Sequence, residues 1–174
     1  MDLEILDQFA SKDAFVEEVK KTTFDTEVRC HGCGQVIVHT FLQLLKIDNP
    51  ELAMAASPFF AGIALTGNTC GSLVGGLMVL GLFFGRKDVN EELPGLIKGV
   101  KPMRNLIKVF TEDNKSLNCK DITGTDLANR MNAAAYFETG GLERCAGIMS
   151  QTAGYVAEMI YDHYHTLKAA KADQ

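Results

Sequence analysis

The sequence predicts an all-α, single-domain helical bundle with a buried, glycine-rich central helix. Apolar residues recur at helical spacing, as at Leu96, Val100 and Met103. Clusters of β-branched residues, which favour strands, are nearly absent outside residues 36–38. The chain has 174 residues, of which 47% are hydrophobic and 22% charged, the balance of an ordinary globular domain.

Capping residues and prolines mark the helix starts in the first half of the chain. Serine, asparagine and aspartate accept hydrogen bonds from the free N–H groups of a first turn, and proline is tolerated at the first helical position. From these signals we expect helices that begin at Ser11 or Asp13, at Cys33, at Pro50 after Asn49, at Pro58 in "SPFFAGIALTG", and at Ser72 in the glycine-rich stretch 72–84.

The second half predicts shorter and more exposed elements. An amphipathic helix begins near residues 86–92, and we expect Pro94 and Pro102 to break it. A polar loop is expected over 111–126, then a short helix over 127–137 and a final helix from Leu142 to Tyr164. The expected organisation is an N-terminal helical extension (1–27), a four-cysteine redox domain (28–165) and a frayed tail (166–174).

Composition argues against several classes of protein. No charged residue stands between Leu52 and Gly85, but Pro58 and "TGNTCG" interrupt this run. The remaining piece, 72–84, is shorter than the roughly 20 apolar residues of a membrane helix, so we expect no membrane span. The net charge is −5 and no basic stripe is present, which disfavours nucleic-acid binding. The acidic N-terminus does not resemble a secretory signal, so we expect a cytoplasmic protein.

Five cysteines are the candidate functional residues, and Cys30 and Cys33 form a Cys-x-x-Cys pair. Helical spacing places Cys33 on one face with Ile37, and Cys145 on one face with Ile148. Cys33 and Cys70 stand near expected helix starts, where free N–H groups and the helix dipole favour a thiolate. Scattered buried cysteines are the alternative, because free cysteine is among the most buried residue types.

The Cys-x-x-Cys pair alone leaves several chemistries open. Attachment of c-type haem requires histidine at position 34, where this chain has glycine, so haem is excluded. A zinc ribbon requires a second closely spaced pair, but the other three cysteines stand apart. A thioredoxin-like fold disagrees with the helical pattern, although dithiol chemistry at Cys30 and Cys33 remains an alternative.

Four segments, taken in order, resemble the C_GCAxxG_C_C family, a small family of redox-active proteins with four shared cysteines. "TCGSLVGGLMVLGL" is similar to its CGAxxG signature, with Ser72 where the family usually has alanine. The other three segments contain Cys33, Cys119 and Cys145: "GCGQVIVHTF", "KVFTEDNKSLNCKDITGTDL" and "RCAGIMSQTAGYVAEMI". Cys30 has no counterpart in this pattern. A related four-cysteine module resembles the iron–sulfur part of split-Soret cytochromes.

The resemblance implies a redox or electron-transfer protein in which four cysteines converge on one site. The residues that would hold an iron–sulfur cluster or a metal are Cys33, Cys70, Cys119 and Cys145. One alternative is a metal-free thiol–disulfide protein that uses Cys30 and Cys33 as catalytic residues, and another is a structural zinc site in an interaction protein. We expect Cys30 to lie exposed at the mouth of the site, near a helix start. A redox partner protein is also expected.

Glycines recur at Gly-x-x-x-Gly spacing. This spacing favours close packing of helices within one chain, and the alternative is that these glycines form the face of a homodimer.

Overall fold

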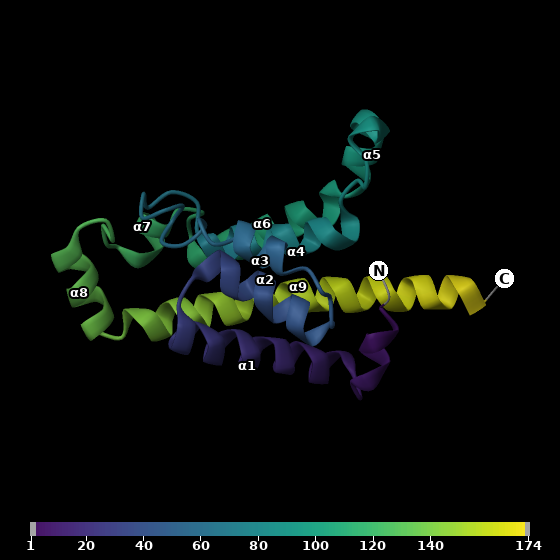
Figure 1. Cartoon of the computed structure of the whole chain (residues 1–174), viewed down its shortest axis with the longest axis horizontal. Helices are drawn as coiled ribbons and strands as arrows, with labels where there is room; N and C mark the ends of the chain where they lie inside the picture. The colour runs from purple at the N-terminus through teal and green to yellow at the C-terminus, as the bar shows by residue number, and fades with distance from the viewer. Residues whose placement is uncertain (1–2, 173–174) are drawn as a thin grey trace.

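A long C-terminal helix, α9 (Gly141–Ala172), forms the axis of the molecule, and α1 (Lys12–Cys30) runs antiparallel along it (Figure 1). The computed structural model describes residues 3–172, and within that range it contains no strand. The all-α prediction is therefore confirmed. The remaining elements in chain order are η1 (Glu4–Gln8), α2 (Cys33–Leu44), α3 (Pro50–Ala55), α4 (Gly71–Phe84), η2 (Val89–Glu91), α5 (Glu92–Lys98), α6 (Val100–Asn114), α7 (Cys119–Thr123) and α8 (Arg130–Glu138).

The predicted capping signals operate at α1 and α3. The Ser11 side chain accepts a hydrogen bond from the N–H of Ala14, and Asn49 caps α3 in the same way. None of the helices in residues 3–172 is both long enough and apolar enough to cross a bilayer.

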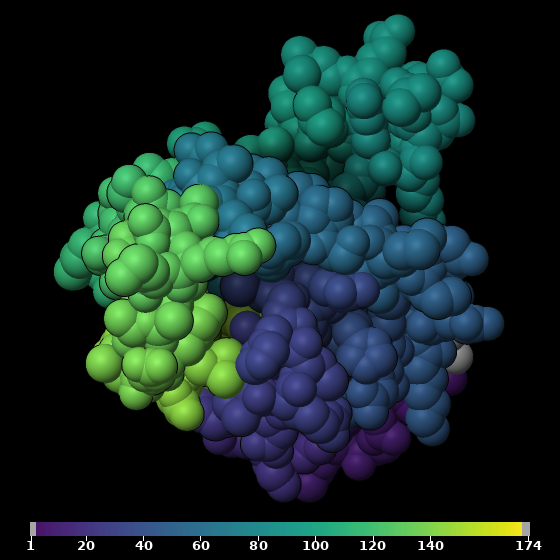
Figure 2. Space-filling model, turned by 60° about the vertical axis from the view of Figure 1, so that its left-hand side comes forward, coloured from purple at the N-terminus to yellow at the C-terminus, as the bar shows by residue number. Residues whose placement is uncertain are grey.

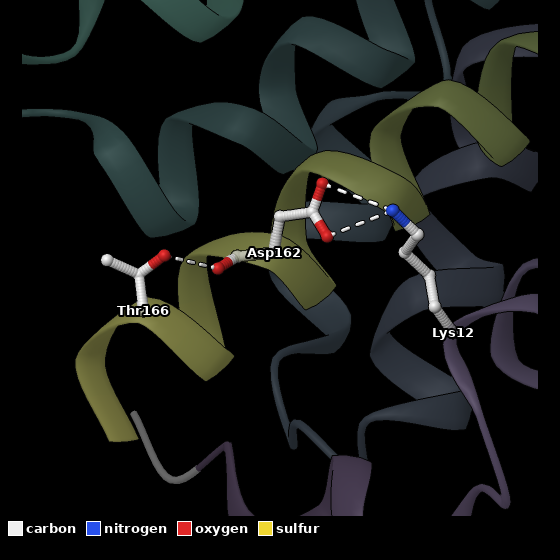
Figure 3. Close-up of polar contacts among 3 residues, drawn as sticks. All are labelled: Lys12, Asp162 and Thr166. Atoms are coloured by element: carbon white, nitrogen blue, oxygen red, sulfur yellow. Dashed lines mark hydrogen bonds and ion pairs between the residues drawn. The ribbon is translucent and has the colours of Figure 1, made fainter. Parts of the chain in front are cut away.

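The pairing of α1 with α9 is held mainly by buried apolar side chains. Phe15 and Val19 of α1 are fully buried in the main core, as is Ile160 of α9. At the surface, Lys12 Nζ lies 3.1 Å from Asp162 Oδ1, while the Thr166 hydroxyl donates to the Asp162 carbonyl (Figure 3). Exposed ion pairs contribute only about 0–1 kcal/mol, so this contact helps to set the register of the two helices more than their stability.

The glycine-rich helix α4 is buried between other elements, as predicted. A Cβ on Gly75 would lie 2.7 Å from the carbonyl oxygen of Gly34 in α2, and a Cβ on Gly71 would overlap the carbonyl oxygen of Phe59. These two glycines therefore allow close packing within the chain. At Gly81 a Cβ would meet nothing within 4 Å, so this position does not require glycine for packing.

The expected break of the helix near Pro94 and Pro102 is confirmed, because the segment forms η2, α5 and α6 in place of one helix. Each proline is the third residue of its helix, where no intrahelical N–H bond is lost. The chain changes direction at Gly99, and α5 projects from the bundle (Figure 1). Two other expectations for the second half were wrong. The expected polar loop at 111–126 contains the end of α6 and the short helix α7. Residues 166–172, expected to fray, continue α9, and residues 173–174 lie outside the described residues.

The predicted helix in "SPFFAGIALTG" is absent. Ala61, Gly62, Ile63, Ala64 and Leu65 all have positive φ, between 46° and 70°, which is incompatible with a right-handed helix. A left-handed conformation costs roughly 1–2 kcal/mol for each residue with a Cβ. Other contacts must stabilise this segment, which we call the left-handed loop (61–65).

Candidate functional site

Four cysteines from separate parts of the chain line one cavity in the structure. Cys33 is the first residue of α2, Cys70 immediately precedes α4, Cys119 is the first residue of α7, and Cys145 lies in the second turn of α9. Apolar side chains, among them Ile122, Ile148 and Met149, complete the wall. Three of the four sulfurs are thus carried at helix starts.

Backbone hydrogen bonds tie Cys70 to Cys119. The N–H of Cys70 donates to Leu117 at 2.8 Å, and the N–H of Cys119 donates to Asn68 at 2.7 Å. Thr69 and Asn118 form an antiparallel bridge between these two bonds. Two cysteines separated by almost fifty residues are therefore held together by the main chain.

The left-handed loop closes one side of the site. A Cβ on Gly62 would lie 2.7 Å from the Cβ of Cys119, so only glycine allows the loop to approach so closely. Burial raises the pKa of the Cys33 thiol, and the N–H of Ala61, which is directed at that thiol, opposes this larger effect. The loop carbonyls of Ala61 and Gly62 accept hydrogen bonds from the N–H groups of Gly67 and Asn68, and the Gly67 carbonyl in turn accepts one from the N–H of Lys120 in α7.

Burial makes the four thiols difficult to ionise. It raises the pKa values of Cys33, Cys70 and Cys119 to about 12 and also raises that of Cys145. The mutual repulsion of the thiolates adds to the effect. The N–H groups of Ser72 and Leu73, at the start of α4, oppose it at Cys70. At pH 7 a thiol with a pKa of 12 is ionised in roughly one molecule in 10⁵.

Tyr136 is a site residue that the sequence did not reveal. Its hydroxyl shares a hydrogen bond of 3.5 Å with the sulfur of Cys145, and this bond lowers the pKa of Cys145 against the larger effect of burial. The guanidinium of Arg144 lies 5.0 Å from the centre of the Tyr136 ring. The short helix α8 has no clear apolar stripe in the sequence, so no periodic signal marks Tyr136 as buried.

Glu27 is a second residue that was missed. It lies near the end of α1 and is buried, and its carboxylate raises the pKa values of Cys33 and Cys145. A signal was present in the sequence, since Val19, Thr23 and Glu27 recur at steps of four and all three are buried.

Residues 31–159 match the family model described as "Putative redox-active protein (C_GCAxxG_C_C)". The chain belongs to this family. Comparison with curated proteins and with solved structures gave no match. The matched segment contains all four cysteines of the cavity. Glu27 and Cys30 lie outside it.

Cys30 does not line the cavity. It is the last residue of α1 and is exposed, so the expectation that it stands near a helix start was wrong. His31 has a φ of 58° and ends the helix, and Gly32 separates it from α2. All five cysteines of the C_GCAxxG_C_C protein are free thiols.

The cavity lined by the four cysteines, which we call the thiol cavity, has the ligand atoms that metals prefer. Its sulfur atoms are not now spaced to hold a metal. Thiolate sulfur is the preferred ligand of iron–sulfur clusters and a good ligand of zinc. The space open to the centre of a water molecule is about 20 Å³, enough for about one water. Across the described part of the chain, no three histidine, cysteine or acidic side chains are placed to hold a metal ion.

Proposed function

We propose that this redox-active protein is an electron carrier and that Cys33, Cys70, Cys119 and Cys145 bind an iron–sulfur cluster. The observation that carries the proposal is that four free thiols, from four elements far apart in the sequence, line one cavity. Four thiolates are the usual ligand set of such clusters, which supply one-electron redox chemistry. Scattered core cysteines would not be expected to share one cavity.

The acid–base state of the thiols favours a metal over a metal-free dithiol. A thiol–disulfide enzyme requires an accessible thiolate with a lowered pKa. Burial instead raises the pKa of Cys33 to about 12. A metal overcomes this obstacle because binding displaces the thiol protons.

Groups around the cavity would tune a cluster held there. Hydrogen bonds to the ligating sulfurs help to set the reduction potential of iron–sulfur centres. The Tyr136 hydroxyl shares such a bond with the sulfur of Cys145. Backbone N–H groups, that of Ala61 at Cys33 and those of Ser72 and Leu73 at Cys70, can form the others. Because the cavity now accepts about one water, the sulfurs must separate before a cluster can occupy it.

Thiol–disulfide chemistry at Cys30 and Cys33 is the second candidate. The exposed, free thiol of Cys30, three residues from Cys33, favours it. A structural zinc site at the four cavity thiols, in an interaction protein, is the third. Five free thiols also suit a reducing compartment, so we propose a cytoplasmic location and a redox partner protein.

Anaerobic purification separates these candidates. An iron–sulfur protein is coloured, contains iron and acid-labile sulfide in similar amounts, and gives an electron paramagnetic resonance signal in one of its oxidation states. A colourless protein that contains zinc would overturn the proposal in favour of the third candidate. Metal-free protein that cannot be reconstituted with iron and sulfide, and that forms a Cys30–Cys33 disulfide on mild oxidation, would favour the second.

A further inference from the structure

A second cavity, which we call the recess, adjoins the thiol cavity. The two share Cys33, Cys119 and Cys145 as wall residues. The recess offers about 100 Å³ to the centres of water-sized groups. Phe60 and Phe137 are the exposed aromatic side chains of its wall, with 38% and 49% of their surface accessible, and the side chain of His31 is exposed there too. Figure 2 shows a hollow on this face, between the green α8 and the purple end of α1.

Glu27 supplies a buried polar group to this largely apolar recess, whose wall also includes the exposed side chain of His31. Only 3% of its surface is exposed, and its Oε2 atom has no hydrogen-bond partner. A buried oxygen without a partner costs about 1–3 kcal/mol. A molecule that donates a hydrogen bond to Oε2 would offset this cost.

Two residues that line the recess have a strained backbone. Ala61 has a φ of 46° and His31 a φ of 58°. Non-glycine residues in this conformation cost on the order of 1–3 kcal/mol each and cluster at ligand-binding and catalytic sites. The strain is a second observation, independent of Glu27, that marks the recess as a binding site.

We propose that the recess binds a small uncharged molecule that has an apolar body and one hydroxyl or amino donor, and that Glu27 accepts its hydrogen bond. The volume excludes nucleotides and flavins, which need cavities of about 300 Å³ or more. The Glu27 carboxyl disfavours anions, and the aromatic rings of Phe60 and Phe137 suit an apolar body. The inference deepens the proposed function and rests on it, because a molecule bound here would lie against three cysteines of the proposed redox site.

Binding of three matched probes to the wild-type protein tests the recess directly. Phenol has a ring and a donor, toluene has the ring alone, and benzoate is an anion. Calorimetry with the protein as isolated should give millimolar binding of phenol, weaker binding of toluene and none of benzoate. Absence of phenol binding, or equal affinity for phenol and toluene, would overturn the proposal.

Two variants test where the probe binds. Glu27→Leu should weaken phenol binding by about fivefold or more, the effect of one lost hydrogen bond, and leave toluene unaffected. Phe137→Ala should weaken both probes, while the exposed control Glu158→Gln should change neither. Unchanged phenol affinity in both Glu27→Leu and Phe137→Ala would place the binding elsewhere and refute the recess. Iron and sulfide are measured on the same samples. Phenol binding by protein without iron would contradict the proposed cluster. Iron in protein that does not bind phenol would contradict only the proposed role of the recess.

Discussion

The hydroxyl of Tyr136 lies 3.5 Å from the sulfur of Cys145, so that a side chain of α8 contacts a thiol carried by α9. Tyr136 is itself almost fully buried, and Arg144 covers one face of its ring. Burial raises the pKa of Cys145, and the hydrogen bond that it shares with Tyr136 opposes this effect. The short helix α8 therefore contributes to the chemistry of the site as well as covering it.

Tyr136→Phe should make Cys145 harder to ionise. Loss of the hydroxyl removes the hydrogen bond that lowers the pKa of Cys145, so the pH–rate profile for its alkylation should move to higher pH. In protein stripped of metal by a chelator, the rate at pH 8 should fall by roughly fivefold. Tyr155→Phe is the matched control, since the Tyr155 hydroxyl donates to Asp113 away from the cavity. A profile that stays in place, or moves to lower pH, would refute the role given to Tyr136.

Cys30 should be the first thiol to be modified in the native protein. It is exposed, whereas Cys70 and Cys119 are buried and Cys33 and Cys145 are partly buried. A brief treatment with iodoacetamide followed by peptide mass spectrometry should find the label mainly at Cys30. All five thiols should react after unfolding in guanidinium. Faster labelling of any cavity cysteine than of Cys30 would contradict the burial described above.

Glu27→Gln should stabilise the protein at neutral pH but not in acid. Burial raises the pKa of Glu27 above 4.5, while the Gly32 N–H and His31 lower it less strongly. The folded state therefore binds the proton more tightly than the unfolded state. The stability that this proton confers is complete below pH 4.5 and is lost as the pH rises through the folded-state pKa.

Thermal melts of wild type and Glu27→Gln at pH 4 and pH 7.5 measure this difference. The two proteins should melt together at pH 4, and the variant should melt higher at pH 7.5. The exposed control Glu158→Gln should show no such divergence. A variant less stable than wild type at pH 7.5 would mean that the charged carboxylate stabilises the fold.

Substituting alanine for each of two glycines of α4 should change the free energy of unfolding in opposite directions. At Gly71 a Cβ would overlap the Phe59 carbonyl and crowd Cys33, so Gly71→Ala should lower the free energy of unfolding by about 1–3 kcal/mol. At Gly81 there is open space, so Gly81→Ala should raise it by about 0.5–1 kcal/mol through helix propensity. Urea denaturation of both variants checks the pair. Equal effects would show that the close approach at Gly71 is not required.

The sequence predicted those parts of the fold and site that depend on local signals. Ser11 and Asn49 marked helix starts because a capping side chain acts within one turn. The four segments around the cavity cysteines identified the family because each is a short, continuous pattern. The candidate ligands could therefore be named before their common cavity was known.

The parts that escaped prediction depend on contacts between distant segments. The stretch at 61–65 has the composition of a helix, yet it is left-handed where it passes close to Cys119. Its carbonyls accept hydrogen bonds from Gly67 and Asn68, the residues that in turn bond to α7. Tyr136 reaches Cys145 only after α8 packs on α9. No local pattern encodes either contact.

The iron content of the five single Cys→Ser variants tests the central proposal most directly. Each protein is reconstituted anaerobically with iron and sulfide, and bound iron is measured per chain after desalting. Cys33→Ser, Cys70→Ser, Cys119→Ser and Cys145→Ser should each lose most of the iron, because each removes one of the four ligands. Cys30→Ser should retain the wild-type content. Full iron in any of the four cavity variants, or loss of iron in Cys30→Ser equal to that in Cys33→Ser, would contradict the assignment of this cavity as the iron–sulfur site.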